Sequence, residues 1–213
     1  ASMLQVQYRI HEDIMEFSSN YFYSGELIAD STISKHQLPG QPPMNFIDTA
    51  GCGYQETVDT ETLSKYNQDE AKILINSLKQ VVEQIGIQEW LDAGYTVGII
   101  TPYSAQVSTL LSMAEDSAVL AEIATLISIN TVDAFQGQER DVIAISLVRS
   151  NDSGEIGFLG DIRRTNVAIT RAKKKVIIIG DSSTLCINPF YNELVEYVQK
   201  KNYYKSAFEL SPP

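Results

Sequence analysis

Three short polar segments hold the residues of this sequence that could carry chemistry: Gln7-Tyr8-Arg9, Gln136–Glu139 and Thr170-Arg171. An arginine supplies a permanent charge and a planar fork of N–H donors, which suits contact with a phosphate group. Arg9 and Arg171 are therefore candidates for binding an anionic ligand. Taken alone, each could equally be a surface or salt-bridged side chain, so the sequence around them has to decide.

The sequence lacks the glycine-rich loops that bind nucleotide phosphates through backbone N–H groups. No G-x-x-x-x-G-K-[ST] segment occurs, and no G-x-G-x-x-G follows a predicted strand. The chain thus has arginines that could complete a phosphate site but no phosphate-binding loop of its own. We predict that it contributes half of an active site.

Two apolar runs, Val142–Val148 and Val176–Ile179, flank the candidate residues. Both are short and rich in β-branched residues, which is typical of strands buried on both faces of a parallel sheet. A basic segment before the second run predicts a helix from about Ile162 to Lys174, with Asp161 as its N-cap. The sequence therefore places a helix between two adjacent buried strands.

On this predicted helix, Arg171 would share a face with Arg164, seven residues earlier. Arg163 and Lys173–Lys175 are expected to form a solvated patch or to face a phosphate backbone. The net charge of −11 argues against a general affinity for nucleic acid, because proteins that bind it usually have a basic surface. We therefore expect a local basic site on an acidic protein.

Strands and helices alternate along the chain, which predicts an α/β domain with a mainly parallel sheet. Further strands are predicted at Met44–Thr49, Thr96–Thr101 and Ile127–Asp133. Ligands of such sheets bind outside the carboxyl ends of the strands. The segments ITPY, NTVDAFQGQE and GDSS follow predicted strands, so all three are expected at that edge.

The clearest predicted helix runs from Asn67 to Gly86 and has apolar residues at the i, i+3, i+4, i+7 spacing. Asn67 and Glu70 resemble a capping box, in which the two residues satisfy each other's backbone N–H groups. We interpret this helix as structural. A last helix is predicted to begin at Asn188-Pro189.

The chain is long enough for one domain, which we assign to residues 4–204. Residues 1–3 have the form of a cloning remnant, and residues 205–213 are predicted to be a flexible tail. The two cysteines lie outside any CxxC or Cys/His cluster, so a zinc site or disulfide framework is not expected. Without a signal peptide or an apolar run of about 18–20 residues, we expect an intracellular, cytoplasmic protein with no membrane partner; in a eukaryote a nuclear location is the alternative.

Five segments in order give the chain a family resemblance: LQVQYRIH, IDTAGCG, VGIITPYSAQV, NTVDAFQGQERDVIAISLVRSN and GFLGDIRRTNVAITRAKKKVIIIGD. Together they resemble the second RecA-like domain of superfamily 1 helicases of the Upf-like branch, which translocates 5′ to 3′. Within this branch the chain looks most like the immunoglobulin-mu-binding-protein-2 type of DNA/RNA helicase. The resemblance implies a three-layer α/β/α fold of the P-loop NTPase type, without its own Walker A loop.

The resemblance also implies roles for particular residues on the nucleotide side. QYR is similar to motif IV, so Arg9 would contact the γ-phosphate of ATP and Tyr8 would lie against the adenine. FQGQE is similar to motif V, with Gly137 near the phosphates and Glu139 at the ribose. TRA is similar to motif VI and makes Arg171 a second γ-phosphate arginine, supplied in trans to the first RecA-like domain.

On the nucleic-acid side, the resemblance implies contacts with single-stranded DNA or RNA. The contacting residues would be Thr101, Pro102, Tyr103, Thr131 and Val132, and Gln136 would couple the two sides. The Walker A lysine, the Walker B acid and the Mg²⁺ ligands would lie on the first RecA-like domain of the same polypeptide, and no metal ligand is expected in this chain. The chain would then hydrolyse ATP only as part of the longer protein.

Two alternatives stay open at this point. The chain could be a binding module that kept the fold without motor activity, although the complete QYR, QGQE and TRA segments favour a motor. It could also belong to a helicase–nuclease, whose nuclease domain would lie outside this sequence. The choice between DNA and RNA is open as well, because no motif here determines recognition of the 2′-hydroxyl.

Overall fold

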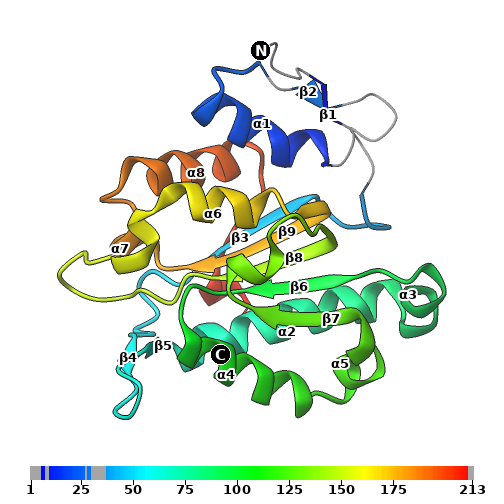
Figure 1. Cartoon of the computed structure of the whole chain (residues 1–213), viewed down its shortest axis with the longest axis horizontal. Helices are drawn as coiled ribbons and strands as arrows, with labels where there is room; N and C mark the ends of the chain where they lie inside the picture. Colours follow the sequence, from blue (N-terminus) through cyan, green and yellow to red (C-terminus); the bar gives the residue numbers. More distant parts are fainter. Residues whose placement is uncertain (1–5, 8–9, 27, 30–36, 211–213) are drawn as a thin grey trace.

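A six-stranded parallel sheet forms the centre of the molecule, with the strand order β10-β3-β9-β8-β6-β7 (Figure 1). The computed structural model describes residues 6–7, 10–26, 28–29 and 37–210. The strands are β3 (Met44–Asp48), β6 (Val97–Ile100), β7 (Ile127–Asn130), β8 (Arg140–Ser146), β9 (Ala172–Gly180) and β10 (Tyr204–Ser206). All strand pairings in this sheet are parallel, which confirms the predicted fold class.

Helices cover both faces of the sheet and produce three layers (Figure 1). One face carries α1 (Glu12–Phe22), α6 (Ile162–Ile169) and α8 (Pro189–Lys200), and the other carries α2 (Gln68–Ile85), α3 (Ile87–Ala93), α4 (Ser104–Glu115) and α5 (Ala118–Glu122). The remaining elements are short: α7 (Ser182–Leu185), the pair β1 (Val6–Gln7) and β2 (Ile28–Ala29), the hairpin β4 (Thr57–Val58) and β5 (Lys65–Tyr66), and the 3-10 helices η1 (Ala124–Leu126), η2 (Val132–Phe135), η3 (Gly157–Gly160) and η4 (Ala207–Glu209). No helix in the described ranges combines the length and apolarity needed to cross a bilayer.

The central strands are apolar on both sides because each side faces a layer of helices. In β8, Ile143 and Ile145 pack into the core under α1, α6 and α8, whereas Val142 and Ala144 pack into the core under α2. Edge strand β7 is different, since its residues alternate between half-buried and exposed. Continuous apolar runs therefore mark the strands at the centre of the sheet.

The basic segment is divided between a helix and a strand, which corrects the predicted helix from Ile162 to Lys174. Helix α6 ends at Ile169, with Asp161 at its N-cap position, and Lys173–Lys175 belong to β9. The parallel register of β8 and β9 explains the change, because Val142 pairs with Lys175. The apolar residues of β8 and β9 pair along their carboxyl-terminal parts. The same register continues toward the amino-terminal ends and draws the basic residues into β9.

Lys175 is buried in this ladder and is not part of a solvated patch. Its ammonium group donates to the carbonyl oxygen of Pro42 at 2.8 Å and to Oδ1 of Asn45 at 2.6 Å. Burial lowers the pKa of Lys175 to about 7. The expectation of a basic patch at Lys173–Lys175 was therefore wrong for Lys175, while Lys173 is exposed.

The predicted flexible tail is structured through residue 210. Strand β10 pairs with β3, with Tyr204 opposite Phe46 and Ser206 opposite Asp48. Ala207 is fully buried in the core under α2. The tail is short and its sequence shows no strand pattern. In the folded sheet, however, the edge of β3 presents backbone N–H and C=O groups that can pair with the tail.

A buried carboxylate connects α2 to the carboxyl end of β8. Asn67 caps α2 as predicted, accepting from the Glu70 N–H at 3.1 Å. The predicted reciprocal bond is absent among the described contacts: Oε1 of Glu70 accepts from the Ser146 hydroxyl at 2.8 Å and from the Val148 N–H at 2.7 Å. Glu70 is fully buried, and burial raises its pKa to about 7 despite these hydrogen bonds.

Replacement Glu70→Gln should remove the part of the pH dependence of the free energy of unfolding that comes from titration of Glu70. Folding raises this pKa from 4.5 to about 7, so the folded chain binds more protons between these values. The stabilisation is present below pH 4.5 and is lost as the pH rises through about 7. Relative to wild type, Glu70→Gln should gain on the order of 2–3 kcal/mol between pH 4.5 and pH 8, measured as the free energy of unfolding in urea.

The matched control for this prediction is Glu83→Gln, because Glu83 lies on the same helix with an exposed side chain. Its pH profile should run parallel to that of wild type. A Glu70→Gln profile that also ran parallel to wild type would show that Glu70 does not titrate in this range.

Candidate functional site

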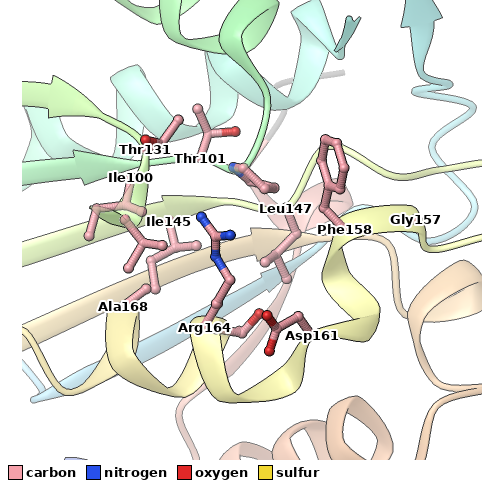
Figure 2. A pocket seen from close by; sticks show the side chains of 13 residues that line it. Ile100, Thr101, Thr131, Ile145, Leu147, Gly157, Phe158, Asp161, Arg164 and Ala168 are labelled. Atoms are coloured by element: carbon pink, nitrogen blue, oxygen red, sulfur yellow. The ribbon is translucent and has the colours of Figure 1, made fainter. Parts of the chain in front are cut away.

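A cavity of about 350 Å³ opens at the carboxyl edge of the sheet, between the strand ends and α6 (Figure 2). Its lining includes Thr101 and Pro102 after β6, Thr131 and Val132 after β7, and Leu147 after β8. Four of the six residues predicted to contact nucleic acid therefore lie together in one cavity. From the opposite side, the 3-10 helix η3 and helix α6 contribute Gly157, Phe158, Asp161, Arg164, Thr165 and Ala168.

Thr101 brings an unsatisfied polar atom to this cavity. The residue is fully buried, and its hydroxyl has no hydrogen-bond partner among the described residues. A buried hydroxyl without a partner costs about 1–3 kcal/mol. Such a cost is expected where a ligand supplies the missing partner.

Tyr103, the fifth predicted residue, lies beside the cavity at the N-cap position of α4 and is almost fully buried. Its hydroxyl accepts from Nη1 of Arg149 at 3.0 Å, and its ring lies 5.1 Å from the ring of Phe158, centroid to centroid, in a stacked arrangement. Tyr103 is therefore held in place by two residues that sequence reasoning did not single out.

Arg149 is positioned by a strained turn at the end of β8. The N–H of Arg149 donates to the Leu147 carbonyl at 2.7 Å, which closes a tight turn around Val148, whose φ is +70°. A β-branched residue with this φ is strained by about 1–3 kcal/mol. Beyond the turn, Nε of Arg149 donates to Glu56 at 2.9 Å. The signal available in the sequence was VRSN, a polar segment directly after a buried strand.

Gly137 lies at the opposite, amino-terminal edge of the sheet, in the loop that enters β8. Gln136 and Gly137 are the central residues of a type II turn, in which the Gln138 N–H donates to the Phe135 carbonyl at 2.9 Å. The third position of this turn needs a positive φ, and Gly137 has φ +73°. No atom lies within 4 Å of the position that a Cβ of Gly137 would occupy, so the backbone is open to a ligand.

Arg171 lies at the same amino-terminal edge. It directly precedes β9, and its carbonyl accepts from the Arg140 N–H at 2.9 Å. Glu139 directly precedes β8, so the two candidate residues begin adjacent strands. Nε of Arg171 is buried and has no hydrogen-bond partner among the described residues. Buried N–H groups normally have an acceptor, so this group favours one supplied from outside these residues.

The two predicted arginines of α6 therefore separate, contrary to the prediction that Arg164 and Arg171 share a helix face. Arg164 lies on α6, lines the carboxyl-edge cavity and forms an ion pair with Asp133. Arg171 lies beyond the helix end, at the other edge. Strand β8 has seven residues, which at about 3.3 Å per residue separates the two edges by roughly 20 Å.

The expectation that NTVDAFQGQE lies wholly at the carboxyl edge was also wrong. Strand β7 ends at Asn130, three residues earlier than predicted, and η2 turns the chain back across the sheet. Phe135 is buried against the sheet near Gly98, where a Cβ would lie 2.9 Å from its ring. The segment thus begins at the cavity and ends at the Arg171 edge, with exposed Gln136 between them.

Tyr8 and Arg9, the remaining predicted residues, lie outside the described part of the chain. In the described part, no cluster of three or more His, Cys, Asp or Glu residues could hold a metal ion. Close to the QYR segment in the sequence, the N–H of His11 donates to the carbonyl of Lys173 in β9 at 3.0 Å.

Comparison of the sequence with known proteins places the chain in a family. Residues 1–183 match the family described as an AAA domain. The chain is 37% identical over 216 residues to DNA polymerase alpha-associated DNA helicase A of Saccharomyces cerevisiae, which covers 92% of the chain and 30% of that protein. It is 36% identical over 220 residues to DNA-binding protein SMUBP-2 of Rattus norvegicus, with 97% of the chain and 21% of that protein covered.

A third relative is regulator of nonsense transcripts 1 of Dictyostelium discoideum, 36% identical, with 93% of the chain and 15% of that protein covered. The chain thus spans less than a third of the length of these relatives. Among solved structures, the C-terminal domain of a possible DNA helicase from Lactobacillus plantarum WCFS1 has a TM-score of 0.46 at 11% identity, covering 94% of this chain and 98% of that one. From the sequence matches, the chain belongs to the AAA domain family, as the C-terminal RecA-like domain of the Upf-like branch of superfamily 1 helicases.

Proposed function

We propose that this chain is the C-terminal motor domain of an ATP-dependent helicase that moves 5′ to 3′ along single-stranded DNA or RNA. The observation that carries the proposal is the buried Nε of Arg171, which has no partner among the described residues and lies at a sheet edge that also holds Gly137 and Glu139. An arginine held in this way suits a phosphate supplied from another domain. The family membership of the chain supports the same conclusion.

The amino-terminal edge would complete an ATP site together with the first RecA-like domain. ATP, bound with Mg²⁺ by that domain, supplies the phosphoanhydride bond whose hydrolysis provides free energy. Arg171, together with Arg9, places positive charge beside the γ-phosphate and stabilises the charge that develops there. Gly137 approaches the phosphates through its open backbone, Glu139 accepts from the ribose hydroxyls, and Tyr8 lies against the adenine.

The carboxyl edge would hold the nucleic acid. Thr101 offers a hydroxyl that no described residue satisfies, and Pro102, Thr131 and Val132 line the same cavity. Tyr103 supports this surface from behind. Contacts with phosphate and sugar carry little sequence information, so base identity should matter little.

Coupling between the two edges is assigned to the segment from Thr131 to Glu139, with Gln136 in its middle. This segment starts in the cavity and reaches the amino edge, where it enters β8. A displacement at the γ-phosphate side would therefore be transmitted to the nucleic-acid side through one short stretch of backbone. An intracellular location and the first RecA-like domain of the same polypeptide as partner belong to this proposal.

A non-catalytic binding module remains the main competing function. It would use the carboxyl-edge cavity and leave Arg171 without a role, whereas Nε of Arg171 is buried with no partner in the part of the chain that the structure describes. A helicase–nuclease is compatible with the same geometry, because the nuclease would lie outside this chain. The effect of replacing Arg171 distinguishes the motor from the binding module.

Replacement Arg171→Ala, made in a longer protein that also contains the first RecA-like domain, should lower kcat of nucleic-acid-stimulated ATP hydrolysis by roughly 10³–10⁵-fold. The physical reason is the loss of a fixed charge that stabilises the transition state. ATP binding, measured separately by fluorescence titration, should change far less.

Arg163→Ala is the matched control for this measurement, because Arg163 is an exposed arginine on α6. Its kcat should stay within a few-fold of wild type. Equal turnover in Arg171→Ala and wild type would show that this edge does not complete an ATP site, and the binding-module alternative would then be preferred.

The 213-residue chain alone should hydrolyse no ATP. It has neither a Walker A loop nor, in its described ranges, an acidic cluster that could hold Mg²⁺. Phosphate release should equal the buffer blank, with and without single-stranded nucleic acid. Turnover that survived repurification and disappeared on unfolding would contradict this division of the active site.

A further inference from the structure

Phe158 is the most exposed aromatic side chain that borders the carboxyl-edge cavity. Its relative exposure is 67%, although it is flanked by apolar cavity residues. Figure 2 shows its ring standing at one side of the cavity, with Arg164 pointing in from α6 and Thr101 and Thr131 opposite. A large aromatic ring exposed beside a cavity is suited to a flat ligand that covers it.

The position of Phe158 is fixed by the residue before it. Gly157 has φ +52°, and a Cβ added there would lie 2.1 Å from Nη1 of Arg149 and 2.7 Å from the Tyr103 hydroxyl. Glycine is therefore required for this close approach. The backbone of η3 is pressed against Arg149 and Tyr103, which sets the place of the ring before any ligand binds.

The inner face of the Phe158 ring is already covered. The ring stacks on Tyr103 with an interplanar angle of 30°, and the guanidinium of Arg149 lies 5.9 Å from the centre of the Tyr103 ring. Arg149 is anchored in turn by its ion pair with Glu56 at 2.9 Å. Phe158 thus packs on a ring that is itself held in place, and it keeps an exposed surface on which a ligand can stack.

Polar groups surround the cavity at positions that suit a nucleotide. The buried Thr101 hydroxyl has no partner among the described residues, and the cavity wall carries Arg164, which is ion-paired with Asp133, and the carboxyl group of Asp161. A nucleobase combines a flat π-face with polar edge atoms and is attached to a phosphate. An aliphatic side chain of a protein partner would cover the ring but would not use the hydroxyl or the charge.

We propose that Phe158 stacks on one base of the bound single strand, and that this base enters the cavity beside Thr101. The inference rests on the proposed function, because it names the group that holds a base at the nucleic-acid edge. Stacking needs only a π-face, so Phe158 accepts any of the bases. Phe158 therefore adds affinity without sequence preference.

Two single-stranded ligands of equal length test this inference: an oligothymidylate and the same phosphodiester backbone with abasic sites throughout. Both carry a fluorescent end label, and binding to the 213-residue chain is measured by anisotropy at one salt concentration. Phe158→Ala should weaken oligothymidylate binding by roughly 5- to 150-fold. Binding of the abasic ligand should stay as in wild type.

Three further variants keep the result specific. Phe158→Trp should retain oligothymidylate binding because it retains a stacking face, whereas Phe158→Leu should lose it. Phe208→Ala is the matched control: Phe208 is 61% exposed but does not line the cavity. Its affinity for both ligands should equal that of wild type.

The possible failures are distinguishable. If Phe158→Ala binds oligothymidylate as well as wild type, the base-stacking role is overturned while the nucleic-acid edge stands. If it loses both ligands equally, Phe158 contacts backbone or maintains the fold, and stacking is again excluded. If the wild-type chain binds neither ligand, the nucleic-acid edge of the proposed function fails and the stacking role fails with it.

Discussion

The parallel register of β8 and β9 determines where the functional residues lie. Val142 pairs with Lys175 and Ser146 pairs with Ile179, so the same ladder places Arg171 before one end and Leu147 beyond the other. A parallel ladder gathers strand beginnings at one edge and strand ends at the opposite edge. Arg171 and the carboxyl-edge cavity consequently lie at opposite edges of one sheet, separated by roughly the length of β8.

The carboxyl edge depends on one buried carboxylate. Glu70 accepts from the Val148 N–H, and Asn67 donates from its side chain to the Val148 carbonyl at 3.1 Å. Both backbone groups of the strained residue are thereby satisfied from the start of α2. This arrangement offsets the cost of the positive φ and directs Arg149 under Tyr103. Helix α2, which its sequence pattern marks as structural, thus holds the carboxyl edge in shape through its first turn.

Two of the five buried side-chain atoms that lack a hydrogen-bond partner among the described residues lie where partners from outside are proposed. Nε of Arg171 faces the edge assigned to a γ-phosphate, and the Thr101 hydroxyl lines the cavity assigned to a single strand. Buried polar atoms normally have partners, so these two positions favour ligand sites over plain structural roles. The acidic net charge is compatible with this arrangement, because positive charge is needed only near the ligands: Arg171 lies at one edge, and Arg164, ion-paired with Asp133, lies at the other.

The sequence by itself determined the parallel α/β fold, the long helix with its Asn67 cap, and the polar segments that hold Thr101 and Arg171. These features depend on local patterns of hydrophobicity, on capping and on the identity of short motifs. Only the tertiary structure decided that the basic run Lys173–Lys175 extends a strand, that residues 204–206 add an edge strand, and that Arg164 and Arg171 lie at opposite edges. Strand pairing and burial depend on residues distant in the sequence, and these long-range contacts outweigh the local preference for a helix or a tail. For the same reason Arg149 and Phe158 became recognisable only when folding placed them against Tyr103.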